Sequence, residues 1–170
     1  LLRQMAVQVA SGVHPFTLDL MTPRRVLLID LENSARQTRR KLRALALAAG
    51  PHLEPAMLIV ECRPEGLDLL LPEDRAWLDR IIGHHRPDMV VTGPIYKLSG
   101  GNPNDETEAK PAAMWLDKMR ASHDIALILE AHTRKSETAN PRHRSKEPFG
   151  WSGWMRWPEF GIGLSKAQHP

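Results

Sequence analysis

The sequence predicts an α/β fold of three layers, in which helices cover both faces of a parallel sheet. Short runs rich in Val, Ile and Leu alternate with segments of helical periodicity, the order expected when crossover helices join parallel strands. The run at 25–31 shows no alternation of polar and apolar residues, as expected of a strand covered on both faces. At 170 residues, 42% of them hydrophobic, the chain is long enough to bury one core. We therefore expect a single domain over residues 1–170.

The first half of the chain predicts helices and strands in alternation. They are a helix at 1–10, a strand at 25–31, a helix at 34–49 and a strand at 56–60. Ser34 and Gln37 have the spacing of a capping box at the start of the second helix, and Gly50, followed by Pro, ends it. The apolar positions of this helix recur at helical spacing, which predicts one buried face.

The second half continues the alternation. Its elements are a helix at 72–82, a strand at 89–92, a helix at 107–122, a strand at 125–131 and a final strand at 160–164. Pro111 is tolerable only in the first turn of its helix, because proline lacks the N–H group that later turns use. The polar, basic segment 136–148 predicts a loop.

Composition excludes several classes of protein. The only cysteine, Cys62, rules out an internal disulfide and a Cys-rich zinc site, so we expect a reducing, cytoplasmic location. No apolar run approaches the roughly 20 residues needed to cross a bilayer, and no membrane association is expected. A net charge of +3 permits binding to nucleotides or nucleic acids without requiring it.

Polar or small residues stand at the ends of three predicted strands. They are Asp30 and Glu32, then Thr92 and Gly93, then Glu130 and His132. In parallel α/β sheets, ligands bind beyond the carboxyl ends of the strands, where such residues meet. Their convergence predicts one binding site at that edge.

Two of these residues have both a catalytic and an ordinary interpretation. The carboxylate of Glu32 has the position of a general base that polarises water near a bound triphosphate. It also suits the solvated first turn of the next helix, where an acidic residue complements the helix dipole. His132 has the position of a sensor of a γ-phosphate, and it also reads as a satisfied histidine at a strand end.

Basic residues near these strand ends form a second group of candidates. Arg134 and Lys135 are placed to neutralise phosphate charge. Contact with a nucleic-acid backbone is the hypothesis for residues in two loops, namely Lys97, Arg142, Arg144 and Lys146. Arg156, within a cluster of tryptophans, is a candidate for reaching a nucleotide across a subunit boundary. The alternative for the loop cations is simple solvation, and for the tryptophans it is packing over the sheet.

Taken in order, these segments resemble the RecA-like P-loop NTPases, and most closely the RepA-type hexameric helicases of the AAA-family ATPase group. Five segments carry the resemblance. Residues 1–12 look like the helix that follows the G-x-x-x-x-G-K-[ST] loop, 26–32 like the strand with the catalytic glutamate, 89–98 like the Walker B strand, 127–135 like the sensor strand, and 150–156 like the Gly-Ser segment before the last core strands. The resemblance places the catalytic glutamate at Glu32 and the sensor at His132.

Two departures from the family pattern affect what the resemblance implies. The Walker A strand and its loop are not in the sequence, so the resemblance implies an N-terminally truncated core, with the phosphate-binding loop expected directly before Leu1 and Leu1 beside the nucleotide. Gly93 stands where the family has the aspartate that holds Mg²⁺. Three alternatives follow for the missing acid: phosphates, water and the Ser/Thr of the absent loop hold Mg²⁺, another carboxylate such as Asp30 substitutes for the aspartate, or hydrolysis is weak.

The resemblance implies an ATP-hydrolysing ATPase that is associated with nucleic acid and uses ATP and Mg²⁺. It implies DNA as a partner, work in replication or in a mobile element, and self-association to a hexamer; the fragment alone is expected to be inactive. One alternative is a non-catalytic regulatory or assembly module that kept the fold, which Gly93 favours. Another is an α/β protein that binds a small molecule, for which the basic loop would not matter.

Overall fold

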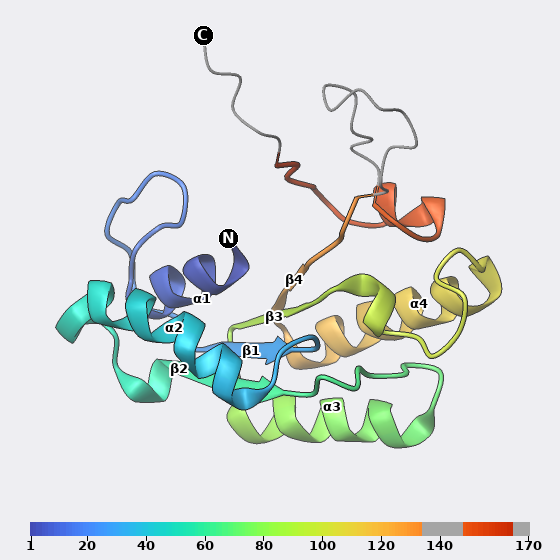
Figure 1. Cartoon of the computed structure of the whole chain (residues 1–170), viewed down its shortest axis with the longest axis horizontal. Helices are drawn as coiled ribbons and strands as arrows, with labels where there is room; N and C mark the ends of the chain where they lie inside the picture. Colours follow the sequence, from blue (N-terminus) through green and yellow to red (C-terminus); the bar gives the residue numbers. More distant parts are fainter. Residues whose placement is uncertain (134–147, 165–170) are drawn as a thin grey trace, which may run out of the picture.

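Four parallel strands form the centre of the computed structural model, which describes residues 1–133 and 148–164 (Figure 1). The strands are β1 (Val26–Asp30), β2 (Leu58–Cys62), β3 (Met89–Gly93) and β4 (Ala126–Leu129). Their order across the sheet is β2-β1-β3-β4. The central pair, β1 and β3, therefore brings its carboxyl ends together, with Asp30 in register with Gly93.

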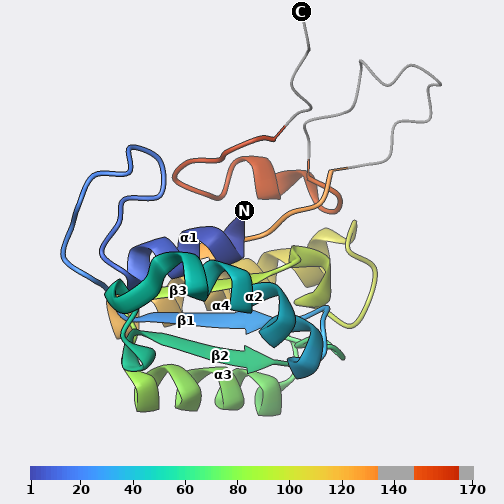
Figure 2. The ribbon, with the colours of Figure 1, turned by 60° about the vertical axis from the view of Figure 1, so that its left-hand side comes forward.

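The helices lie on both faces of this sheet, so the predicted three-layer α/β fold is confirmed (Figure 2). The α-helices of the described residues are α1 (Leu2–Ala10), α2 (Ala35–Ala49), α3 (Pro72–His85) and α4 (Glu106–His123). Alternate residues of β1 point to opposite faces, as the pleat of a strand requires. Val26 and Leu28 pack with α1 and α2, whereas Leu27 and Ile29 pack with α3 and α4.

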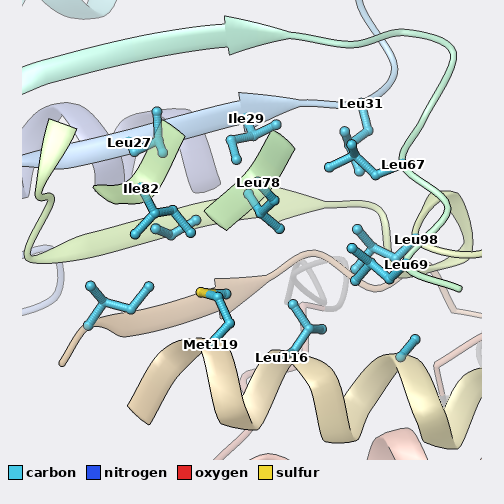
Figure 3. Close-up of a cluster of buried hydrophobic side chains, with 13 residues drawn as sticks. Leu27, Ile29, Leu31, Leu67, Leu69, Leu78, Ile82, Leu98, Leu116 and Met119 are labelled. Carbon is cyan, nitrogen blue, oxygen red and sulfur yellow. The ribbon is translucent and has the colours of Figure 1, made fainter. Parts of the chain in front are cut away.

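The larger apolar cluster lies between the sheet and the α3–α4 layer, and Figure 3 shows its side chains meeting. Leu27 and Ile29 of β1 lie opposite Leu78 of α3 and Leu116 of α4, and all four are fully buried. Burial of each such side chain contributes about 2 kcal/mol of hydrophobic free energy. This packing fixes β1 on its α3–α4 face. The backbone that carries the residues after β1 therefore starts from a firmly held strand end.

The capping box predicted at the start of the second helix is present, whereas Pro111 lies further inside its helix than predicted. The capping box is present at α2, where the Ser34 hydroxyl accepts from the Gln37 N–H and the Gln37 side chain accepts from the Ser34 N–H. Asp105 caps α4 by accepting from the Thr107 N–H. Pro111, however, lies inside α4 beyond its first turn, and the helix continues past it. The surrounding packing, with Ala109, Ala112 and Ala113 buried, outweighs the loss of one helical hydrogen bond.

Two predicted strands differ in the structure. β4 ends at Leu129, so Glu130 and His132 belong to the extended segment after it and not to the strand. The final strand expected at 160–164 is wrong, because these residues are irregular and their large apolar side chains are exposed. Glycine weakens a strand, and none of the described strands pairs with this run of alternating Gly and apolar residues. Among the described residues, no helix has both the length and the apolar composition that crossing a bilayer requires.

Candidate functional site

A small cavity lies where the carboxyl ends of β1 and β3 meet the first turn of α1. Its lining includes residues from all three elements and from the segment after β4, among them Arg3, Asp30, Thr92, Gly93 and Glu130. The segment after β4 is tied to β3, because the Glu130 N–H donates to the Thr92 carbonyl at 2.9 Å and the Ile95 N–H donates to the Glu130 carbonyl at 2.8 Å. The strand ends predicted to converge therefore do meet at one edge.

Asp30 lines this cavity and accepts hydrogen bonds from the elements around it. Its buried carboxylate accepts hydrogen bonds from Arg3 at 2.6 Å and from the Thr38 hydroxyl of α2 at 2.8 Å. It also accepts from the backbone N–H groups of Glu32 and Asn33 and from the Asn33 side chain. Burial alone raises the pKa of Asp30, but the hydrogen bonds from Asn33, Arg3 and Thr38 outweigh burial and hold that pKa well below its ordinary value. Asp30 is therefore an ionised structural hub.

Arg3 is a site residue that the sequence analysis missed. It is the one charged residue of α1, and that isolation on an otherwise uncharged helix is the signal that would have found it. Its Nη2 binds Asp30, whereas its Nε is buried without a hydrogen-bond partner among the described residues. Thr38 was missed for a different reason, since its position at helical spacing reads as one more apolar contact of α2.

The predicted base and the predicted sensor lie on either side of one tyrosine. The Tyr96 hydroxyl donates to Glu32 Oε1 at 2.7 Å, and the Tyr96 ring meets the His132 ring edge-on at 5.6 Å between centroids. The hydrogen bond to Glu32, together with burial and the negative charges of Glu32 and Glu130, raises the pKa of Tyr96 to about 12. The three strand exits that carry these residues thus share one set of side-chain contacts.

Gly93 has no room for a side chain. Its φ is +140°, and a Cβ added to it would lie 2.6 Å from Glu130 Cβ and 2.8 Å from the Glu130 backbone nitrogen. The space that an acidic side chain would need at this position is filled by Glu130. The Glu130 carboxylate is itself half-exposed and lies 3.6 Å from His132 Nε2.

The geometry gives the two nearby carboxylates different capacities for Mg²⁺. Both oxygens of Asp30 already accept several hydrogen bonds, so the expected substitution of Asp30 for the Walker B acid does not fit its surroundings. Within the part of the chain that the structure describes, Glu130 has no such network, and it lines the same cavity. Among the described residues, no cluster of three or more His, Cys, Asp or Glu is arranged to hold a metal ion.

The remaining predicted site residues are more dispersed. Leu1 precedes α1 and is exposed, and Arg156 is exposed at the end of a short 3₁₀ helix, Ser152–Met155. Lys97 was predicted to contact a nucleic-acid backbone. Its amine donates a hydrogen bond to the Pro64 carbonyl at 2.9 Å, which the sequence did not predict. Five predicted phosphate or nucleic-acid contacts lie outside the described residues, namely Arg134, Lys135, Arg142, Arg144 and Lys146.

The tryptophan cluster packs over the sheet edge beside the candidate site. Trp154 is buried against Ile95 of the β3 exit and against Ala109 and Ala113 of α4. The Trp157 Nε1–H donates to Asp117 at 2.8 Å. Packing over the sheet, one of the two interpretations given for the tryptophans from the sequence, thus accounts for these two rings.

Comparison with known proteins places this arrangement in a family. A search of curated proteins finds no match. The sequence model of a family described as AAA domain matches residues 1–138, which includes α1, the four strands and every site residue up to His132. The match, the four-stranded parallel sheet and the grouping of polar residues at its carboxyl edge agree with one another. The chain belongs to the AAA domain family of nucleotide-hydrolysing P-loop ATPases.

Proposed function

We propose that the chain is the catalytic part of an ATP-hydrolysing, nucleic-acid-associated ATPase of the RepA-type helicase kind. The observation that carries the proposal is that Glu32 and His132 lie on either side of Tyr96, next to the cavity lined by Arg3, Asp30 and Glu130. These residues come from the first turn of α1, from the ends of β1 and β3 and from the segment after β4. Their grouping at the carboxyl edge is what a nucleotide site in this type of sheet requires.

Glu32 is the residue that orients the attacking water in this proposal. Tyr96 holds one carboxylate oxygen, and the Glu32 side chain is exposed at the rim. The backbone N–H of Glu32 is fixed by Asp30 at 3.1 Å, so both ends of the residue are restrained. A restrained carboxylate that reaches solvent can accept a proton from water while that water attacks a phosphoryl group.

Glu130 is the side chain that would hold Mg²⁺, which when bound neutralises charge on the phosphates. His132 would read the phosphate state, since its imidazole lies 3.6 Å from Glu130 and its ring contacts Tyr96. The His132 carbonyl also accepts from the Phe149 N–H at 2.6 Å. Movement of His132 is therefore linked directly to the segment that contains the tryptophans.

Contact with DNA and assembly into a hexamer complete the proposal. The order of motifs supports both, and the loop that contains Arg142, Arg144 and Lys146 supplies the charge that a DNA backbone attracts. Lys97 and the predicted phosphate contacts Arg134 and Lys135 keep their proposed roles. Arg156 is exposed, as a residue that reaches a neighbouring subunit must be.

The test is ATP turnover by the protein that contains this sequence, with and without single-stranded DNA. Glu32→Gln removes the base but keeps the shape, and we expect it to reduce kcat by about 10²- to 10⁴-fold. Glu54→Gln is the matched control, because Glu54 is an exposed carboxylate before the amino end of β2 and should leave turnover unchanged. Equal activity of wild type and Glu32→Gln would exclude Glu32 as the base.

A second function, a non-catalytic regulatory or assembly module, is favoured by one observation. Gly93 supplies no acid, and Glu130 fills the space in which an acid would stand. ATP binding without turnover, in the presence of DNA and Mg²⁺, would support this module and oppose the ATPase. Neutralising Arg142, Arg144 and Lys146 separates either function from that of a protein that binds a small molecule. Only a DNA-binding protein would then lose affinity for DNA and show a smaller dependence of that affinity on salt concentration.

A further inference from the structure

We infer that Tyr96 is a positioning residue, which holds the carboxylate of Glu32 in its working orientation and couples that orientation to His132. The inference rests on the proposed function, because it assigns a task to Tyr96 in the same reaction. It starts from the 2.7 Å hydrogen bond between the Tyr96 hydroxyl and Glu32 Oε1.

The backbone that carries Tyr96 is firmly anchored. Tyr96 lies in a short 3₁₀ helix, Ile95–Lys97, between the buried side chains of Ile95 and Leu98. The Ile95 N–H donates to the Glu130 carbonyl, and the Leu98 carbonyl accepts from the Leu69 N–H at 3.0 Å. A side chain on such a support holds its partner in one place. Glu32, in contrast, lies in an exposed loop, where a glutamate without a partner samples several rotamers.

The contacts of the Tyr96 ring provide the coupling. Besides His132, the ring meets Phe149 edge-on, with centroids 6.4 Å apart. His132 and Phe149 are joined by the hydrogen bond between the Phe149 N–H and the His132 carbonyl. A shift of the imidazole therefore moves a ring that is bonded to Glu32. Such a contact network lets the state of the sensor change the orientation of the base.

The charges around the phenol favour its role as a donor. The titratable groups that face it are Glu32, Glu130 and His132. The two carboxylates disfavour a tyrosinate, so the hydroxyl keeps its proton and donates throughout the neutral range.

The contact itself is tested by Raman spectroscopy at neutral pH, without nucleotide. The chain has one tyrosine, so the tyrosine Fermi doublet reports Tyr96 alone. We expect the doublet ratio of a phenol that donates a strong hydrogen bond in the wild type, and the ratio of a solvated phenol in Glu32→Ala. Identical ratios in the two proteins would overturn the contact.

The positioning role is tested by Tyr96→Phe, which keeps the ring and removes the hydroxyl. We expect kcat to fall about ten-fold, the value of one such hydrogen bond, while KM changes less than two-fold. Protein labelled with 3-fluorotyrosine, which retains the hydroxyl at this single site, should keep the wild-type kcat. Because the ring transmits the state of His132, Tyr96→Phe and His132→Ala should have non-additive effects on kcat.

The outcomes separate this inference from the proposed function. If Tyr96→Phe has unchanged or higher kcat while Glu32→Gln is inactive, the enzyme stands and the positioning role is wrong. If the wild type hydrolyses no ATP although the Raman contact is present, the proposed function fails and the inference fails with it, but for a different reason. A fall in kcat for Tyr96→Phe that 3-fluorotyrosine does not reproduce supports the positioning role.

Discussion

The guanidinium of Arg3 donates a 2.6 Å hydrogen bond to the carboxylate of Asp30 and so joins the first turn of α1 to the end of β1. The carboxylate is almost completely buried, whereas Arg3 is partly exposed. Asp30 uses the same two oxygens to hold Thr38 of α2 and the backbone of Glu32. One ionised group therefore aligns two helices and the loop of the proposed base.

Asp30→Asn should reduce the free energy of unfolding by about 3 kcal/mol at pH 7. When the amide oxygen accepts from Arg3 and Thr38, the amide NH₂ group faces the backbone N–H donors of Glu32 and Asn33, which then lose their acceptor. Removal of the carboxylate charge also leaves the charge of Arg3 uncompensated. The folded pKa of Asp30 is lowered, so its stabilising contribution is fully present above the unfolded pKa of about 3.9 and is lost as pH falls through the lower folded pKa. Urea unfolding should thus show a constant difference between wild type and variant from about pH 5 to 8, and a smaller one below about pH 4.

Glu54→Gln provides the control for this measurement, because its exposed side chain should change stability by less than about 0.5 kcal/mol. A difference between wild type and Asp30→Asn that grows as the pH falls would contradict the assignment of Asp30 as an ionised hub.

Tyr96 should ionise about two pH units above an ordinary phenol. Its pKa of about 12 results first from the hydrogen bond to Glu32, so Glu32→Ala should bring it back toward its usual value of about 10. At pH 11 the wild type should then be about one-tenth ionised, since the pH is one unit below the pKa. Absorbance at 295 nm measures the tyrosinate, and far-ultraviolet circular dichroism on the same sample shows that the fold is intact. Half-ionisation of the native wild type near pH 10 would contradict the contact.

Gly93→Ala should destabilise the fold by about 2 kcal/mol or more. Alanine disfavours a φ of +140°, and its Cβ would overlap the Glu130 backbone. Gly93→Asp should be at least as destabilising and should not restore a metal ligand, because the larger side chain meets the same obstacle. Thermal unfolding measures both variants. Gly161→Ala is the matched control, since no atom of the described residues lies within 4 Å of a Cβ at that glycine. Native stability of Gly93→Asp would show that the space is not filled.

The sequence predicted the fold better than it predicted the connections within the site. Strand and helix identities follow from local patterns, and the carboxyl-edge position of Glu32, Gly93 and His132 follows from the parallel order of the strands. Tyr96 and Arg3 were not assigned to the site, because their roles depend on partners 64 and 27 positions away. A pattern of spacing carries no information about which of several nearby polar groups an exposed side chain will bind. Gly93 was read as a lost acid, and only the approach of Glu130 shows that the space itself is occupied.

Trp154→Ala should destabilise the fold and also weaken the support of Tyr96. Trp154 is 5% exposed and packs against Ile95, the residue before Tyr96, so its removal leaves a cavity directly beside the β3 exit. Truncation of a buried tryptophan costs about 3 to 5 kcal/mol. Met155→Ala, with a side chain that is 57% exposed, should change the free energy of unfolding by less than about 0.5 kcal/mol. Urea unfolding measures both, and the Raman doublet of the folded Trp154→Ala protein should move toward that of a solvated phenol. An unchanged doublet in a destabilised variant would show that Tyr96 holds Glu32 independently of the tryptophan cluster.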